Sequence, residues 1–229
     1  MTALDDCIGR VIEELSRLGL DEDTIVIFTS DHGGMLYSQN FFGKTKPWNE
    51  SVNIPLIARW KGKIPQGQVC EELISQIDLM PTILSMCGVE LKEAVDGLDL
   101  SEVFFGRSNK GPKSAFINYY VVPLTFKYKE WRGVVTNQYT YAKFKDRKWI
   151  LYDNIHDKFQ LNNLIDNSEY RDVVNKLDDM TGEWLEKLGD TFETSKEIAD
   201  RLYPEHKDAI IPYYENDIIK NGKEKKRRI

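Results

Sequence analysis

The 229-residue chain is long enough to bury a sizeable hydrophobic core, as one large or two small domains. Its 41% hydrophobic and 30% charged residues are ordinary for a globular protein, and its net charge of -6 argues against a nucleic-acid partner. No apolar run has the length of a transmembrane helix, and residues 1–6 do not read as a signal peptide, so we expect no membrane partner and leave localisation undetermined. The three scattered cysteines fit neither a metal site nor a disulfide framework.

The first 30 residues predict a helix followed by a buried strand. Apolar residues recur at helical spacing from Leu4 to Leu18, and Gly19 is a typical helix stop. The apolar, β-branched run from Ile25 to Phe28 carries no charge, which is typical of a strand buried on both faces in a parallel sheet. This pattern predicts an α/β fold.

A candidate site follows that strand directly, in the segment Ser30-Asp31-His32-Gly33-Gly34. Ligands of open α/β sheets bind just beyond the carboxyl ends of strands, and glycines let the backbone approach closely. A carboxylate suits Ca²⁺ or Mg²⁺, whereas an imidazole suits Zn²⁺ and other transition metals, so this pair alone does not identify the metal. Two ligands do not complete a site, and other residues must contribute.

The segment from Tyr37 to Asn53 is a long loop whose aromatic content argues against disorder. Lys44 and Lys46 lie in it, and they are either solvated or placed so that one of them holds an anionic oxygen. Residues 54–60 predict a second strand, and a helix is expected from an N-cap at Asp78 to Gly88. Residues 107–113 are the best linker candidate.

The remainder of the chain predicts a small α+β subdomain. Four short runs, at residues 115–121, 130–136, 138–144 and 148–152, predict an antiparallel meander. An amphipathic helix over residues 169–188 is expected to pack on it, and residues 223–229 form a polar, basic tail. We therefore divide the chain into residues 1–110 and residues 111–229.

Several stretches of the sequence resemble the sulfatase family of the alkaline-phosphatase-like superfamily. They are Thr24-Ile-Val-Ile-Phe-Thr-Ser-Asp-His-Gly33, Gly43-Lys44, Trp48-Asn-Glu-Ser-Val-Asn-Ile-Pro-Leu-Ile57, Ile77-Asp-Leu-Met-Pro-Thr-Ile-Leu-Ser-Met-Cys-Gly-Val89, Asp96-Gly-Leu-Asp-Leu100 and Trp149-Ile-Leu-Tyr-Asp153 with Gln160-Leu-Asn-Asn-Leu164. They follow the family's order from about residue 3 to about residue 190. The resemblance implies part of a mixed, mostly parallel sheet with flanking helices, followed by a small subdomain with an antiparallel sheet.

The resemblance also implies roles for particular residues. Asp31 and His32 match the downstream pair of ligands to a divalent cation, usually Ca²⁺, with Mg²⁺ as the alternative. Lys44 matches the lysine that contacts the sulfate group. Gln39 stands where some members of the family have a histidine.

The chain departs from the family in lacking the nucleophile. Sulfatases use a formylglycine made from Cys or Ser in a Cys/Ser-x-Pro-x-Arg motif, and no such motif occurs here. The upstream acidic metal ligands are also absent, because Asp5-Asp6 matches the helix before the Asp-His strand. The sequence thus looks like the C-terminal portion of a sulfatase, with half of the metal site and without activity by itself.

Two other functions stay open at this point. One is a phosphomonoester, phosphodiester or phosphonate hydrolase of the same superfamily, and the other is a non-catalytic, truncated or degenerate sulfatase-like protein. For the intact enzyme the resemblance implies a sulfated small molecule or glycan as substrate. Trp48, Asn49, Tyr120 and Arg132 are candidate pocket residues, for which packing or surface roles are favoured. Cutting a parallel sheet exposes an edge, so self-association through it is expected.

Overall fold

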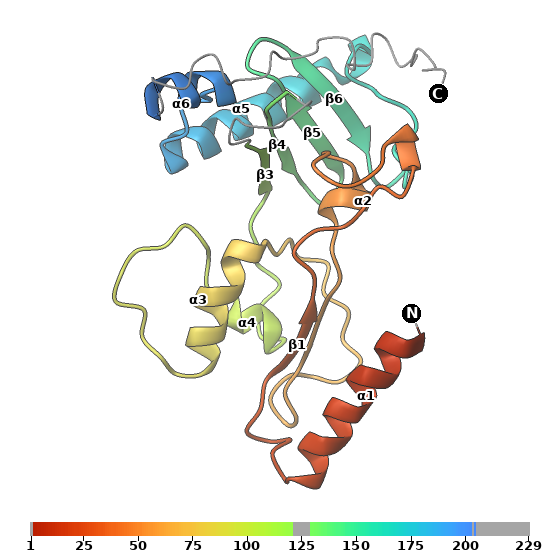
Figure 1. Ribbon diagram of the computed structural model, residues 1–229, viewed down its shortest axis with the longest axis vertical. Coiled ribbons are helices and arrows are strands. Elements are labelled where there is room, and N and C mark those ends of the chain that lie inside the picture. The colour runs from red at the N-terminus through yellow and green to blue at the C-terminus, as the bar shows by residue number, and fades with distance from the viewer. Residues whose placement is uncertain (1, 121–128, 203, 205–229) are drawn as a thin grey trace. The chain divides into compact units, whose positions relative to one another are not determined.

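The computed structural model describes residues 2–120, 129–202 and 204 (Figure 1). The chain forms two compact units, which are described separately below. The first unit comprises Met1–Asp31 and Ile54–Pro112, and the second comprises His32–Asn53 and Lys113–Ile229. The break after Pro112 lies within the segment that the sequence favours as a linker, whereas residues 32–53 group with the C-terminal part of the chain.

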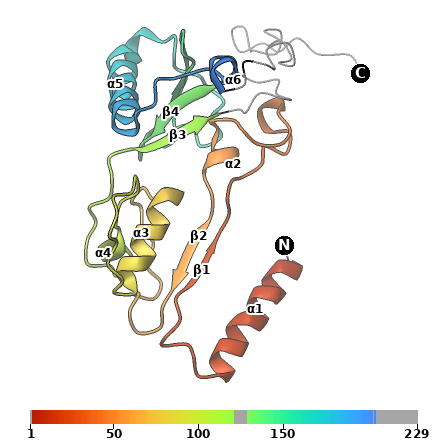
Figure 2. The ribbon, with the colours of Figure 1, turned by 60° about the vertical axis from the view of Figure 1, so that its left-hand side comes forward.

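The first unit is built around a strand pair. Helix α1 spans Thr2–Arg17, strand β1 spans Val26–Thr29 and strand β2 spans Leu56–Arg59. The strands pair antiparallel, with Val26 opposite Arg59. Figure 2 shows helices α3 (Gln76–Met86) and α4 (Ser101–Phe104) on one side of this pair and α1 on the other.

The expectation that residues 25–28 form a strand buried on both faces, with parallel neighbours, is corrected by this arrangement. The described part of β1 is half-buried along Val26–Phe28 and exposed at Thr29, and β2 is its antiparallel partner. The physical reason is that each of these strands has one described neighbour, so one edge of each is left uncovered. The apolar run that predicts a fully buried central strand is therefore only half-buried within the described residues.

Asp78 is not the N-cap of α3, as the sequence suggested, but lies in its first turn. Ser75 is the N-cap, and its backbone N–H donates to Asp78 Oδ2 at 2.8 Å, which is half of a capping box. The other oxygen, Oδ1, accepts from the N–H of Leu98 at 2.8 Å. Gly97 permits this close approach, since a Cβ there would lie 2.0 Å from the carbonyl oxygen of Ile77. The turn after α3 is therefore fixed by one buried carboxylate.

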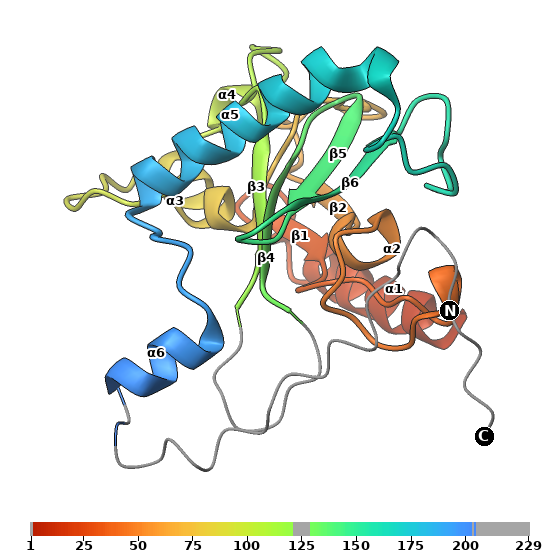
Figure 3. The same ribbon diagram turned by 90° about the horizontal axis from the view of Figure 1, so that it is seen from above.

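The second unit contains the predicted antiparallel meander. Its strands are β3 (Ala115–Tyr119), β4 (Trp131–Val135), β5 (Tyr139–Lys143) and β6 (Lys148–Asp153), paired in that order. A turn of 3-10 helix, η2 (Ser168–Tyr170), leads into α5 (Arg171–Leu188), and α6 (Ser195–Leu202) follows. Figures 1 and 3 show α5 lying across the sheet, which confirms the predicted helix-on-sheet packing.

The two faces of this sheet bury different partners because side chains alternate along each strand. Val134, Tyr141 and Leu151 point toward α5, where Val174 and Leu177 are buried with them. The neighbouring positions on the strands face the other way and form a second core with residues of the long loop. That core consists of Met35, Trp48, Tyr119, Trp131, Ala142, Phe144, Ile150 and Tyr152.

The long loop itself carries two short helices, η1 (Ser38–Asn40) and α2 (Asn49–Val52). Its aromatic residues are packed on the sheet, as their number in the sequence suggests: Trp48 is buried and stacks on Phe41 with a centroid separation of 5.4 Å. The basic tail at residues 223–229 lies outside the described residues. No helix in the described ranges is long and apolar enough to cross a membrane.

We predict that the purified chain associates with itself through the first unit. The side chain of Ile57 on β2 is 63% exposed, and Val11 on α1 is 59% exposed. Ile57→Lys places a charge on this strand and is expected to weaken association, whereas Ile155→Lys, at a position of the second unit that is 56% exposed, should not. Light scattering over a range of concentrations measures this, and a wild-type monomer at every concentration would contradict it.

Candidate active site

The carboxyl end of β1 is anchored by a side chain that sequence reasoning missed. Gln76, the first residue of α3, donates from Nε2 to the carbonyl oxygens of Ser30 at 3.0 Å and of Asp31 at 2.6 Å. These bonds fix the backbone at the strand end and leave the Asp31 carboxylate exposed at the surface. The signal for Gln76 in the sequence was weak, because a glutamine at the start of a helix is common.

His32 begins the second unit, one peptide bond after Asp31. Its Nδ1 lies 2.8 Å from the carbonyl oxygen of Gly33, so we assign the proton to Nδ1. In that tautomer Nε2 is an acceptor, and it is in contact with Nζ of Lys44. The structure thus brings together a histidine and a lysine that lie 12 residues apart in the loop.

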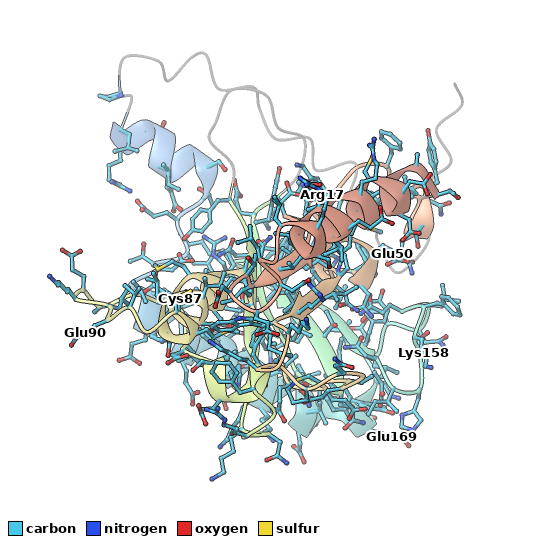
Figure 4. The ribbon with its side chains drawn as sticks, turned by 90° about the horizontal axis from the view of Figure 1, so that it is seen from below. Arg17, Glu50, Cys87, Glu90, Lys158 and Glu169 are labelled. Atoms are coloured by element: carbon cyan, nitrogen blue, oxygen red, sulfur yellow. The ribbon has the colours of Figure 1, made fainter. Side chains whose placement is uncertain are left out.

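Gly33 is required at its position by a close backbone contact. Its N–H donates to the carbonyl oxygen of Ser51 at 2.9 Å. A Cβ at Gly33 would lie 2.0 Å from the carbonyl oxygen of Glu50, a backbone atom that cannot move aside cheaply. Glu50 itself projects from α2, and its carboxylate accepts a hydrogen bond from Ser38 Oγ (Figure 4). The start of the loop at Gly33 and its end at Glu50 and Ser51 are therefore in close backbone contact next to His32.

The two lysines of the loop have different surroundings. Lys44 is exposed and reaches His32, whereas Lys46 is 5% exposed with its Nζ 4.6 Å from the centroid of the Phe41 ring. Lys46 is therefore buried and makes a cation–π contact with Phe41, whereas the Lys44 side chain is accessible to a ligand. Residue type and spacing alone left the two lysines equivalent, and only the resemblance to the sulfatase family singled out Lys44.

Gln39, where some sulfatases have a histidine, takes part in the loop's own structure. Its Nε2 donates to the carbonyl oxygens of Phe159 at 3.0 Å and of Gln160 at 2.9 Å. Gln160 is fully buried, and its side chain bonds Thr140 and Asn154 while accepting from the backbone N–H of Asn49. A buried glutamine with all its hydrogen bonds satisfied is a structural connector. Nothing in the sequence pattern marked Gln160.

The four candidate pocket residues divide into packing and surface roles. Trp48 is 1% exposed within the core, and Arg132 has no exposed surface. The guanidinium of Arg132 pairs with Asp190 at 2.5 Å, and it stacks 3.8 Å from the ring centroid of Tyr120. Asn49 begins α2, and its backbone N–H is bonded to Gln160. Arg132 thus forms a buried ion pair with Asp190, and this pair links β4 to the residues that follow α5.

The fit of a divalent cation can be judged from the donors themselves. Among the described residues there is no group of three or more His, Cys, Asp or Glu side chains that could hold a metal ion. Asp31 offers the exposed oxygens that Ca²⁺ prefers, while Nε2 of His32 lies against the positive charge of Lys44. Lys44 must withdraw before a cation can reach that nitrogen, and its exposed, flexible stem allows this. Each of the two residues thus offers a donor of a type that a divalent cation accepts.

Comparison with known proteins identifies the family. The family model described as N-sulphoglucosamine sulphohydrolase, C-terminal, matches residues 38–187. The chain therefore belongs to this family of sulfatases, within the alkaline-phosphatase-like superfamily.

Individual relatives agree with this assignment. The ulvan-active sulfatase of Formosa agariphila is 31% identical over 97% of this chain and 44% of its own length. The endo-4-O-sulfatase of Bacteroides thetaiotaomicron is 35% identical over 88% of this chain and 43% of its own length. A solved structure of a protein in complex with its substrate, D-glucosamine-2-N,6-O-disulfate, superposes with a TM-score of 0.76 at 27% identity, covering 83% of this chain and 40% of that one. The chain thus spans less than half the length of these proteins.

We predict that Gly33→Ala disturbs the site and that Gly34→Ala does not. The new Cβ at Gly33 would overlap the backbone of Glu50, whereas at Gly34 it would make an ordinary contact 3.8 Å from the carbonyl oxygen of Gly43. Overpacking of this kind costs about 1–3 kcal/mol in the free energy of unfolding. Urea titration of both variants measures the difference, and equal stabilities would contradict the close contact.

We also predict that stability depends on the carboxylate of Asp190. Burial raises its pKa, but hydrogen bonds from Arg132 and Tyr120 outweigh this and hold the pKa below its ordinary value. A lowered pKa stabilises the fold above the unfolded value of about 3.9 and ceases to do so as the pH falls through the folded value. Asp190→Asn should therefore cost about 3 kcal/mol at neutral pH and flatten the loss of stability in acid.

Asp179→Asn, at an exposed position on α5, is the matched control. The free energy of unfolding of both variants is measured across about pH 2 to 7, a range that brackets the ordinary carboxyl pKa of about 4. Parallel curves for the Asp190 and Asp179 variants would refute the role of the buried pair.

Proposed function

We propose that this chain is the C-terminal portion of a sulfate-ester hydrolase and that it supplies the anion-binding lysine of the site. The contact between Nζ of Lys44 and Nε2 of His32 is the observation that carries this proposal. This contact brings a positive charge to His32, the residue that follows Asp31 in the chain, and α/β enzymes bind ligands just beyond the carboxyl ends of strands. Membership of the sulfatase family supports sulfate as the anion.

Lys44 would stabilise the negative charge on the oxygens of the transferring sulfuryl group. An ammonium group is a compact point charge with three donors on a flexible stem, so Lys44 can turn from His32 to a sulfate oxygen bound nearby. Fixed charges of this kind contribute most when they are aimed at the oxygens where charge develops. In this role Lys44 acts as a binding and catalytic residue.

Asp31 and His32 would provide part of a site for a divalent cation, Ca²⁺ in preference to Mg²⁺. When bound, such a cation acts as a Lewis acid toward the sulfuryl oxygens. Asp31 fits this role through its exposed carboxylate, and His32 fits it once Lys44 has moved to the anion. The remaining ligands must come from residues other than these.

A sulfated glycan is the proposed substrate class. This rests on the relatives, one of which is an endo-4-O-sulfatase and another of which was solved with a disulfated glucosamine as its substrate. The 229 residues contain no formylglycine motif, so we propose that the chain by itself does not turn over sulfate esters.

The test joins the chain to a sulfatase that has the nucleophile. In a chimera this chain replaces the matching region of the Bacteroides thetaiotaomicron endo-4-O-sulfatase, in a host that makes formylglycine. We expect hydrolysis of a sulfated disaccharide by the chimera and none by the isolated chain. Lys44→Ala should lower kcat/KM by about a hundredfold, as loss of one oxyanion donor does.

Lys92→Ala, at an exposed position, is the control and should leave kcat/KM unchanged. Equal effects of the two lysine variants, or turnover by the isolated chain, would refute the proposal. A phosphonate monoester assayed in parallel distinguishes the alternative: if the chimera prefers it to the sulfate ester, the phosphonate hydrolase activity is the correct one.

A further inference from the structure

The peptide on either side of Lys44 is held by a hydrogen bond. On one side, the carbonyl oxygen of Gly43 accepts from the N–H of Met35 at 2.6 Å, within the loop. On the other side, the carbonyl oxygen of Thr45 accepts from Nε1 of Trp131 at 3.1 Å. The second bond comes from β4 and joins residues 86 positions apart in the sequence. Lys44 is thus an exposed side chain on a backbone fixed at both ends.

The bond from Trp131 meets a strained part of the loop. Thr45 has a φ of 78°, in the left-handed region that a β-branched residue avoids. Such a conformation persists only where the surrounding structure holds it. Trp131 can do so because its ring is 3% exposed and fixed in the core formed with Met35 and Trp48.

We infer that Trp131 is a positioning residue for the anion-binding lysine. By holding the carbonyl group of Thr45, its indole N–H keeps the strained peptide in place and directs Lys44 toward His32. This inference rests on the proposed function of Lys44. It gives the C-terminal antiparallel sheet a part in orienting Lys44, through the hydrogen bond from β4 to the neighbouring peptide.

Trp184 offers a matched control in the same unit. Its indole N–H also donates a hydrogen bond, to Ser114 Oγ at 2.9 Å, and its ring packs against α5's side of the sheet. Trp131→Phe and Trp184→Phe therefore remove the same donor and similar volumes from opposite faces of one sheet. Only the first removes a bond next to Lys44.

The experiment is NMR on the full chain, with the nuclear Overhauser cross-peak between the ε-methylene of Lys44 and the ring protons of His32 as readout. We expect the cross-peak in the wild type and in Trp184→Phe, and its loss in Trp131→Phe while the remaining spectrum of the unit persists. A cross-peak that survives in Trp131→Phe, or that is lost equally in both variants, overturns the inference.

A second measurement needs no variant, in case Trp131→Phe does not fold. A scalar coupling across the hydrogen bond, from Nε1 of Trp131 to the carbonyl carbon of Thr45, is expected in the wild type. Its absence, with an indole proton that exchanges rapidly, overturns the inference. If the coupling is present but Lys44 does not respond to added sulfate, the proposed function fails while the positioning role of Trp131 stands.

Discussion

The packing of residues 32–53 against one face of the β3–β6 sheet is the constraint on which the candidate site depends. Met35 and Trp48 are each 1% exposed in this core, and complete burial of such side chains contributes about 1.5–3 kcal/mol apiece. This burial holds a loop that has several left-handed residues and little regular structure. Together with the hydrogen bonds within the loop, this packing holds the backbone that carries Lys44 and His32.

The same packing gives the small sheet of the second unit two buried faces. One face of the sheet takes α5, as an ordinary α+β subdomain requires, and the other takes the loop that carries Lys44. Because side chains alternate between the two faces along each strand, Trp131 and Ile150 face the loop, whereas Val134 and Leu151 face the helix. The sheet is therefore both the core of the second unit and the support of the candidate site.

Much of this fold follows from periodicity in the sequence. The meander and α5 are correct in type and nearly in length, because alternation and helical spacing are local signals. The candidate residues Asp31, His32 and Lys44 came from position and from resemblance, and the structure adds the contact between the last two. The family assignment was likewise available from motifs in register.

The rest depends on contacts between distant residues, which no local pattern reveals. That Lys46 packs over Phe41 while Lys44 stays exposed is decided by the three-dimensional path of the loop. Gln76, Gln160 and Trp131 act through hydrogen bonds to residues far away in the sequence: Gln76 bonds Ser30, 46 positions away, Trp131 bonds Thr45, 86 positions away, and Gln160 bonds Asn49, 111 positions away. The pairing of β1 also escaped prediction, since an apolar run indicates a buried strand but not its neighbours.

The central claim, that Lys44 binds sulfate beside His32, is tested most directly by observing the lysine side chains. Sodium sulfate is added to the labelled chain, with sodium chloride at equal ionic strength as reference, and the Nζ and ε-methylene signals are followed. Our account predicts a saturable, sulfate-specific shift at Lys44 and at the ring of His32, with none at Lys92. Equal shifts at all exposed lysines, or none at Lys44, would contradict it.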